Sequence, residues 1–340
     1  MRYASMCCML DEATRNLFIA EINRILPKNS QNRLISAMRY VLLAPAKYIR
    51  PFLVIASSSI FNIKVEKAIT AAAAIEFIHA YSLIHDDLPC MDNSDTRRGQ
   101  PSCHKKFGEA TAILAGDALL TLAFEVLSSL NCEIIKVLSQ AIGVRGMVGG
   151  QILDINSEHI DFNPQPYVIP VLDTGIQKAL PTSISCKKPC DGEAEHEMDS
   201  SVKHWNDTLS TLKPQHSYGC MYNAGMTSGQ ADKIKEVHLM KTAKLFAASC
   251  EIGAIIGNAT SEERRASYNY GINLGLIFQA KDDIEDYEQD KTNNLISVLG
   301  KSEMEEYIDG LFKQASDNLS VLSGNTNYLY DLLNQVRKDG

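Results

Sequence analysis

The chain has 340 residues, 45% of them hydrophobic, and 41 acidic against 33 basic side chains give a formal net charge of −8. This acidic, globular composition argues against a general nucleic-acid or anionic-membrane binder, because such partners favour dense Lys and Arg. The lack of any uninterrupted apolar run of roughly 18 residues, or of a signal peptide's apolar stretch at the start, predicts a cytoplasmic protein without stable membrane insertion.

Most of the chain has the pattern of helices. In residues 10–157, and again from 232 to about 337, apolar and small side chains recur at spacings of three and four, and no strand pattern stands out. The stretches 68–87 and 109–130 are rich in Ala and apolar over most of the helical circumference, which is typical of helices inside a bundle. The sequence therefore predicts an all-α bundle.

Residues 158–231 differ from the rest of the chain. They contain six of the 11 prolines and the only tryptophan, without sustained periodicity. Proline spacing forbids long helices here, so we predict a loop-like or disordered insertion in what is otherwise a single domain over 1–340. A zinc-binding segment with Cys186, Cys190 and His196 is the alternative, but their spacing fits no standard finger. The nine cysteines of the chain, odd in number and mostly scattered, suit reduced thiols.

The first candidate site is a run of acidic side chains at the end of an apolar helix. Within ten residues lie Asp86, Asp87, Asp92 and Asp95. Carboxylates this close raise each other's pKa unless a cation lies among them, and such hard oxygen ligands suit Mg²⁺ or Mn²⁺. Pro89 interrupts the helix, so the backbone must bend to bring Asp86 and Asp92 together. A solvated acidic helix end is the alternative.

A second acidic cluster lies in the segment 279–290. Asp282 and Asp286 are four residues apart and therefore share a helix face with Gln279, while Asp283 lies beside them. Alone, an acidic helix face is more often surface than metal site. Two such clusters, each a pair of aspartates followed by a third after an apolar helix, predict a cavity in which several divalent ions hold a diphosphate.

Basic side chains complete the predicted site. Arg binds phosphate oxygens through a planar fork and Lys binds them as a point charge. A single Lys or Arg is usually a solvated surface residue, and only the combination with the acidic clusters singles out Lys47, Arg50, Arg97, Arg98 and Lys241.

These motifs resemble the trans-isoprenyl diphosphate synthases, also called the polyprenyl synthetase family, and within it the short-chain bacterial farnesyl diphosphate synthases. Residues 78–125 are similar to the family's first aspartate-rich region and the helix after it, and residues 278–290 to the second. The resemblance covers roughly 40–157 and 232–325. It implies an isoprenoid synthase fold, a bundle of roughly ten or more helices around a central cavity, and a homodimer.

The resemblance also implies roles for individual residues. Asp86 and Asp92 would ligate two Mg²⁺ ions and Asp282 a third, with Asp87, Asp283 and Asp286 as supporting or water-mediated ligands; Mn²⁺ could replace Mg²⁺. The residues that would bind the allylic diphosphate are Arg97, Lys241, Thr242 and Gln279. Those that would bind the diphosphate of isopentenyl diphosphate are Lys47, Arg50, His79 and Arg98.

The implied reaction is a prenyl transfer that adds isopentenyl diphosphate successively to dimethylallyl and geranyl diphosphate, giving farnesyl diphosphate and releasing diphosphate. Tyr81, with Ser82 beside it, lies about one helical turn before the first acidic cluster, where bulk governs product length in this family. An aromatic side chain there resembles the enzymes that stop at 15 carbons. A tyrosine packed in a core is the alternative interpretation.

Other functions stay open at this point. A geranylgeranyl diphosphate synthase would use the same site, and a non-catalytic regulatory subunit of a heteromeric synthase would share the fold. The subunit interpretation draws support only from departures from the family pattern. Pro45, Ala46, Lys47 and Tyr48 stand where the family has Gly-Gly-Lys-Arg, and the segment after Asp290 is shorter. A terpene cyclase would lack Lys47, Arg50 and Arg98, which argues against that function.

Overall fold

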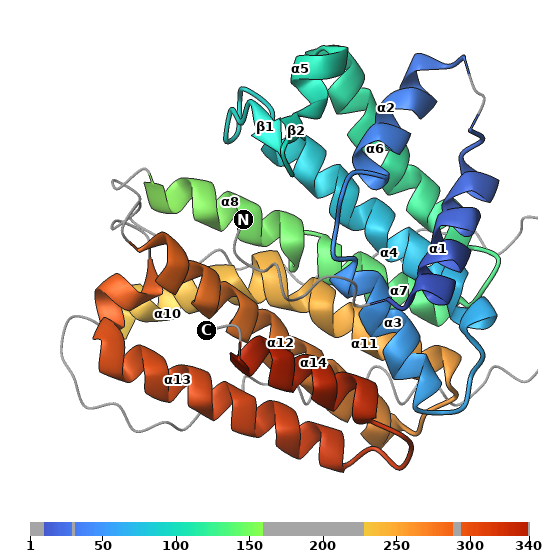
Figure 1. The fold of residues 1–340 in the computed structure, drawn as a ribbon. Helices are drawn as coiled ribbons and strands as arrows, with labels where there is room; N and C mark the ends of the chain where they lie inside the picture. The colour runs from blue at the N-terminus through green and yellow to red at the C-terminus, as the bar shows by residue number, and fades with distance from the viewer. Residues whose placement is uncertain (1–9, 29–30, 159–227, 288–293, 339–340) are drawn as a thin grey trace, which may run out of the picture. The chain divides into compact units, whose positions relative to one another are not determined.

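The computed structural model describes residues 10–28, 31–158, 228–287 and 294–338 (Figure 1). These residues confirm the predicted all-α fold. The elements are α1 (Glu12–Ile25), α2 (Arg33–Leu42), α3 (Ile49–Ser59), α4 (Val65–Asp86), β1 (Thr96–Arg97), β2 (Gln100–Pro101), α5 (Cys103–Phe107), α6 (Glu109–Leu127), α7 (Cys132–Ile142), α8 (Met147–Glu158), α10 (Ser228–Val237), the π-helix η3 (His238–Ala243), α11 (Lys244–Ile256), α12 (Ser261–Asp286), α13 (Leu295–Ser320) and α14 (Asn327–Lys338).

Helix α4 is the central element of the fold. Its alanines 71–74 are fully buried, and apolar side chains cover most of its circumference, as expected of a helix enclosed by others. Small side chains let α6, α3 and α1 pack closely around it. The packing of the rest of α4 therefore holds in place its last turn, which ends at Asp86.

By length and mean hydropathy alone, two described helices, α4 and α6, could cross a membrane. In α4, 72% of the most apolar window is buried inside the fold, as in a core helix, whereas in α6 the share is 33%. Helix α6 leaves Ile113 and Leu114 exposed, at 44% and 58%.

The C-terminal helices pack against the N-terminal ones through α11 and α3. Helix α12 lies between α11 and α13, and η3 contacts both α12 and α8. Thr260 and Glu263 form a reciprocal capping box at the start of α12, which satisfies free main-chain N–H groups there. The described residues on both sides of 159–227 thus belong to one compact unit.

The boundaries of the insertion, predicted at about 158–231, need a correction. Helix α8 includes Glu158, and at the other end α10 already begins at Ser228. The reason is that Ala231 and Ile234, three residues apart, are both buried and so extend an apolar helix face towards the N-terminus. The rest of the insertion, including the three candidate zinc ligands, lies outside the described residues, and its loop-like character stays a prediction.

A short hairpin was not predicted. Thr96 pairs with Pro101 and Arg97 with Gln100 in an antiparallel arrangement. Two residues a strand are too few to show the alternation by which strands are recognised in a sequence. The turn between them, Arg98 and Gly99, has positive φ at both residues (54° and 75°), as a two-residue hairpin turn of type I′ requires.

Candidate active site

The first acidic cluster folds back on the end of α4. The main-chain N–H of Asp92 donates to the carbonyl of Asp86 at 2.9 Å, and that of Ser94 donates to the carbonyl of Asp87 at 3.2 Å. These bonds satisfy carbonyl groups that the end of a helix leaves without partners. They also bring Asp92 next to Asp86, which is the bend that the sequence predicts.

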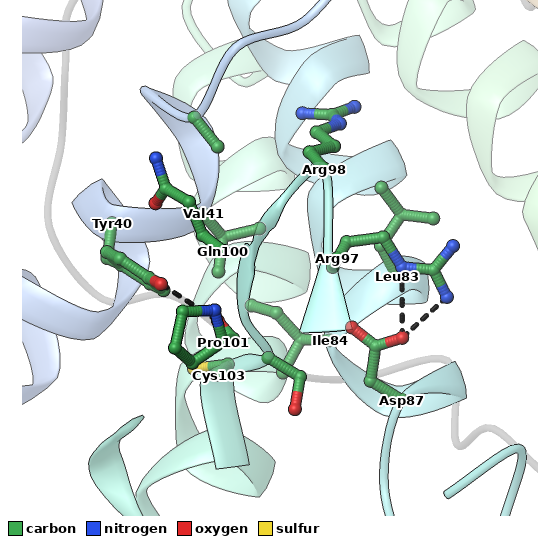
Figure 2. Close-up of a pocket in the computed structure, with 12 residues that line it drawn as sticks. Tyr40, Val41, Leu83, Ile84, Asp87, Arg97, Arg98, Gln100, Pro101 and Cys103 are labelled. Carbon is green, nitrogen blue, oxygen red and sulfur yellow. Dashed lines mark hydrogen bonds and ion pairs between the residues drawn. The ribbon is translucent and has the colours of Figure 1, made fainter. Parts of the chain in front are cut away.

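The hairpin sends its two arginines to different partners. Arg97 donates from Nε to Asp87 Oδ1 at 2.9 Å, and its second guanidinium nitrogen binds the same oxygen. Figure 2 shows Arg97 turned towards Asp87 and Arg98 pointing away from it. Asp87 is buried, so its carboxylate is engaged by Arg97 instead of facing solvent. This pair orients Arg97 at the edge of the first acidic cluster.

Arg98 approaches a buried carboxylate on α4. Its guanidinium lies 4.0 Å from Oε1 of Glu76, a residue only 1% exposed. Burial raises the pKa of Glu76 to about 7, although Arg98 and Arg50 oppose that rise. Glu76 was not among the predicted site residues, because it follows a run of alanines and has the spacing of a core position.

Arg50 and His79 also meet in this region. Burial, reinforced by Arg50, Arg98 and Arg97, holds the pKa of His79 well below its ordinary value. His79 is therefore neutral and accepts a hydrogen bond through Nε2 from Arg50, at 3.2 Å. The Arg50 guanidinium also lies 4.6 Å from the ring centre of Phe246, a favourable cation–π distance.

Glu76→Gln is expected to change the pH dependence of stability. The pKa of Glu76 is about 7 in the folded protein against an ordinary 4.5, so the folded state holds the extra proton between these values. Wild-type stability therefore falls by up to roughly 3 kcal/mol from this group as the pH rises through that window. The Gln side chain does not ionise, so the variant does not lose this stability as the pH rises.

Thermal melts followed by circular dichroism at about pH 5 and about pH 8 check this. The difference in Tm, Glu76→Gln minus wild type, should become more positive at the higher pH. A difference that is the same at both values would contradict the buried, proton-binding state of Glu76.

Lys241 lies in the π-helical segment η3, a geometry often found at functional sites. Its Nζ donates to Oδ2 of Asp154 on α8 at 2.6 Å. Gly150 allows α8 to come this close, since a Cβ at that position would lie 2.3 Å from the main-chain nitrogen of Lys241. The charges of Asp154, Asp86 and Asp92 favour the protonated lysine. Lys241 thus joins α8 electrostatically to the first acidic cluster.

Asp86 and Asp282, one in each acidic cluster, have a raised pKa. Burial raises the pKa of Asp86 to about 6; Lys241 opposes this and Asp92 adds to it. Asp282 is exposed to solvent, but the surrounding protein removes part of its hydration. This desolvation, together with the negative charges of Glu285, Asp286 and Asp283, raises the pKa of Asp282 to about 7. Lys47 opposes that rise. A bound cation would relieve the cost of ionising both groups.

The second acidic cluster occupies the last two turns of α12. Asp282 and Asp286 are exposed, whereas Asp283 is buried and accepts the main-chain N–H of Leu295 at 2.8 Å. Gln279 accepts the hydroxyl of Thr242 through Oε1 at 2.9 Å. The structure thus places Thr242 and Gln279 in contact, while Asp283, unlike Asp282 and Asp286, is buried.

The turn before α3 is built without the family's glycines. Tyr48 has φ of 51°, a left-handed conformation that is unfavourable for a side chain of its size. Its buried hydroxyl donates to the carbonyl of Leu42 at 3.0 Å, and its ring lies 5.0 Å from that of Phe18. These contacts hold the strained residue in place and position Arg50 in the first turn of α3.

The two residues predicted to set product length lie on α4. Tyr81 is buried, its ring packs edge-on against His85 at 5.8 Å, and burial raises its pKa to about 12. Ser82 donates its hydroxyl to the carbonyl of His79 at 2.9 Å. Tyr81 therefore presents bulk one turn before Asp86, while Ser82 is satisfied within the helix.

Within the described ranges, no three His, Cys, Asp or Glu side chains lie close enough to hold a metal ion by themselves. Three buried or partly buried partners of the predicted residues were not found from the sequence: Glu76, Asp154 and His238, whose Nε2 lies 3.5 Å from Oδ2 of Asp283. For Asp154, the signal available was the paired glycines 149–150 ahead of it in a helix. For Glu76 and His238, no pattern in the sequence marked them.

Comparison with known proteins agrees with the motifs. The family model described as "Polyprenyl synthetase" matches residues 31–171 and 208–306. The chain is 33% identical over 322 residues to the heterodimeric geranylgeranyl pyrophosphate synthase large subunit 1, chloroplastic, of Arabidopsis thaliana, covering 88% of this chain and 70% of that protein. It is 34% identical over 292 residues to geranylgeranyl pyrophosphate synthase 12, chloroplastic, of the same plant, covering 83% of this chain and 63% of the relative.

Solved structures give the same result. An FPP/GFPP synthase from Zymomonas mobilis is 31% identical in sequence to this chain and superposes with a TM-score of 0.66. The match covers 94% of this chain and 97% of that one. A geranyltransferase from Legionella pneumophila shares 27% at a TM-score of 0.67, over 96% and 95%.

Proposed function

Because the chain belongs to the polyprenyl synthetase family, that is, the trans-isoprenyl diphosphate synthases, we propose that it is a prenyltransferase. It would join isopentenyl diphosphate to an allylic diphosphate and release diphosphate. The main support is the first acidic cluster, where Asp86, whose pKa is raised to about 6, lies near Asp92 and the charge of Lys241. Such a mixture of crowded carboxylates and cations suits a metal-bound diphosphate.

The donor set fits Mg²⁺, with Mn²⁺ as an alternative. Mg²⁺ is commonly held by one or two carboxylates together with substrate phosphates, so a site without three converging protein ligands is consistent with it. The residues that would hold it are Asp86, Asp92, Asp282 and Asp286. Bound Mg²⁺ would stabilise the charge that develops on the departing diphosphate.

The basic residues divide between two diphosphates in this proposal. Lys241 and Arg97, on the side of the first acidic cluster, would bind the allylic diphosphate. Arg50, Arg98, Lys47 and neutral His79 would bind that of isopentenyl diphosphate. Arg50 supports this directly, because its Nε is buried without a hydrogen-bond acceptor in the described part of the chain. A phosphate oxygen would supply the missing acceptor.

The reaction needs no nucleophile from the protein. The allylic carbon–oxygen bond breaks, the double bond of isopentenyl diphosphate attacks the resulting cation to form a carbon–carbon bond, and a proton leaves to the released diphosphate. The protein's part is to place the two substrates and to exclude water, which would quench the cation. The apolar side chains of α4 suit that task.

We propose farnesyl diphosphate as the product, because Tyr81 is buried one turn before Asp86. Tyr81→Ala is expected to shift the main product from 15 to 20 carbons or more, since it removes an aromatic ring from the path of the growing chain. Chromatography of dephosphorylated products checks this, with Phe at position 81 as the control that keeps the bulk. An unchanged product length in the Ala variant would remove Tyr81 as the determinant.

Geranylgeranyl diphosphate is the second candidate product. Two relatives reported above are named geranylgeranyl pyrophosphate synthases. The deciding assay incubates the purified protein with Mg²⁺, isopentenyl diphosphate and each allylic primer in turn, and measures product length. Formation of no product with any primer would favour the non-catalytic subunit instead.

We further propose a homodimer that buries the exposed face of α6. Leu114 is 58% exposed and Ile113 44%, on a helix whose composition is that of a core element. Exposed apolar surface of this kind usually marks an interface. Light scattering should give the mass of two chains, and Leu114→Glu should reduce it; a single-chain mass for the wild type would contradict the proposal. One relative is named as a heterodimeric large subunit, so a different partner is the other outcome.

A further inference from the structure

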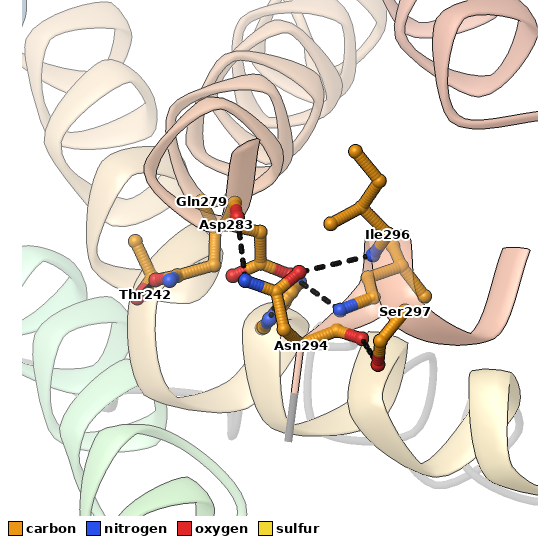
Figure 3. A network of polar contacts seen from close by, with 8 residues as sticks. Thr242, Gln279, Asp283, Asn294, Ile296 and Ser297 are labelled. Carbon is orange, nitrogen blue, oxygen red and sulfur yellow. Dashed lines mark hydrogen bonds and ion pairs between the residues drawn. The ribbon is translucent and has the colours of Figure 1, made fainter. Parts of the chain in front are cut away.

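The end of α12 and the start of α13 are joined through main-chain groups that helices leave unsatisfied (Figure 3). The side chain of Asp283 accepts the first N–H of α13, from Leu295, at 2.8 Å. Asn294 accepts the next N–H, from Ile296, at 3.0 Å through Oδ1, and its Nδ2 donates to the carbonyl of Asp283. We call this set of contacts between Asp283 and Asn294–Ile296 the helix junction.

The helix junction continues into η3. Gln279 hydrogen-bonds the carboxylate of Asp283, and Thr242 donates to Oε1 of Gln279 at 2.9 Å. Nε2 of His238 lies 3.5 Å from Oδ2 of Asp283. Thr242 follows Lys241 directly in η3, so one connected set of contacts joins the second acidic cluster to the segment that contains Lys241.

Burial separates Asp283 from the other members of its cluster. Asp283 is 8% exposed and Asn294 5%, whereas Asp282 and Asp286 face solvent. Main-chain N–H, amide and imidazole groups already surround the Asp283 carboxylate. Turning it towards a metal would leave the buried N–H of Leu295 without an acceptor, at a cost comparable to a lost hydrogen bond.

We propose that Asp283 and Asn294 are positioning residues that fix the last turn of α12 and hence the directions of Asp282 and Asp286, and that Asp283 is not a metal ligand. The proposal rests on the proposed prenyltransferase function for its catalytic consequence. Its structural part stands independently, because the helix junction stabilises the fold whether or not the protein turns over.

Two pairs of variants test the proposal. Asp283→Asn keeps an oxygen that can accept from Leu295, and Asp283→Ala removes it. Asn294→Ser keeps a cap for α13 but cannot bridge to α12, and Asn294→Ala loses both functions. Asp282→Asn is the matched comparison, since it neutralises the adjacent, exposed carboxylate. The thermal melting of each variant is measured without metal. Electron paramagnetic resonance measures its binding of Mn²⁺ with diphosphate present. Steady-state kinetics at varied Mg²⁺ concentration give kcat and the Mg²⁺ half-saturation.

Asp283→Asn should bind Mn²⁺ within about twofold of wild type and keep its Mg²⁺ half-saturation, while Asp282→Asn weakens both at least about tenfold. Asp283→Ala and Asn294→Ala should lower Tm and reduce kcat about 10- to 100-fold, without changing the Mg²⁺ half-saturation. If either alanine variant fails to fold, the milder variants Asp283→Asn and Asn294→Ser still test the proposal.

Weakened Mn²⁺ binding by Asp283→Asn, equal to that of Asp282→Asn, would overturn the proposal. So would wild-type Tm and kcat in both Asn294 variants. If the wild-type protein makes no product, the proposed function fails, while the melting and Mn²⁺ measurements still report on the helix junction.

Discussion

Replacing Asp86 with Asn is expected to lower kcat about 10²- to 10³-fold or more while the protein stays folded. The carboxylate lies beside Asp92 and near Lys241, and in the proposed site it would hold a metal whose charge stabilises the departing diphosphate. Asn keeps the shape but loses the charge. Because burial raises the pKa of Asp86 to about 6, its ionised form costs stability above that pH, so the variant's Tm should not fall at about pH 8.

Asp95→Asn is the control for this experiment. Asp95 belongs to the same acidic segment, but its exposed side chain pairs with Lys105 at 2.8 Å on the surface. A surface pair of this kind contributes little to stability, and the change should leave kcat near the wild-type value. Equal losses in the two variants would mean that general acidity, and not the position of Asp86, matters.

Lys241→Met is expected to reduce kcat/KM for the allylic substrate about 10²- to 10³-fold. The lysine combines an ion pair with Asp154 at 2.6 Å and the nearby charges of Asp86 and Asp92, which keep it protonated. Removing one preorganised positive group from a site where negative charge develops has effects of this size. Steady-state kinetics with the allylic diphosphate varied at saturating isopentenyl diphosphate measures the change.

Lys244→Met, less than one turn further along the same helical run, is the matched control. Lys244 donates to the main-chain carbonyl of Arg145 and is not among the residues proposed to bind substrate. Its loss should change kcat/KM by less than about tenfold. A similar loss at both positions would indicate a general effect of helix packing, and would contradict the special role of Lys241.

Local sequence patterns were enough to predict the helices and to locate the two acidic clusters, whose role as a metal site stays a prediction. The apolar circumference of α4 and the spacing of Asp282 and Asp286 are properties of one segment each, so periodicity reveals them. The return of Asp92 to Asp86 also follows locally, since Pro89 ends the helix and the loop is short.

The cytoplasmic location stays a prediction.

Contacts between distant segments were not predictable in the same way. Lys241 and Asp154 are 87 residues apart in the chain, and only folding shows that they meet. Paired aspartates posed a second difficulty, because consecutive residues in a sequence look alike but point about 100° apart on a helix. Asp87 binds Arg97 and Asp283 binds the start of α13, while their neighbours Asp86 and Asp282 do neither.

The two-residue turn of the hairpin fixes where Arg97 and Arg98 lie relative to each other. Arg98 and Gly99 reverse the chain in two residues, and the reversal leaves Arg97 beside Asp87 and Arg98 near Glu76. A longer turn would let the two guanidinium groups move independently of each other, whereas the two-residue turn fixes the distance between them. In the proposed site, this two-residue turn would therefore set the spacing between the groups that hold the charged heads of the two substrates.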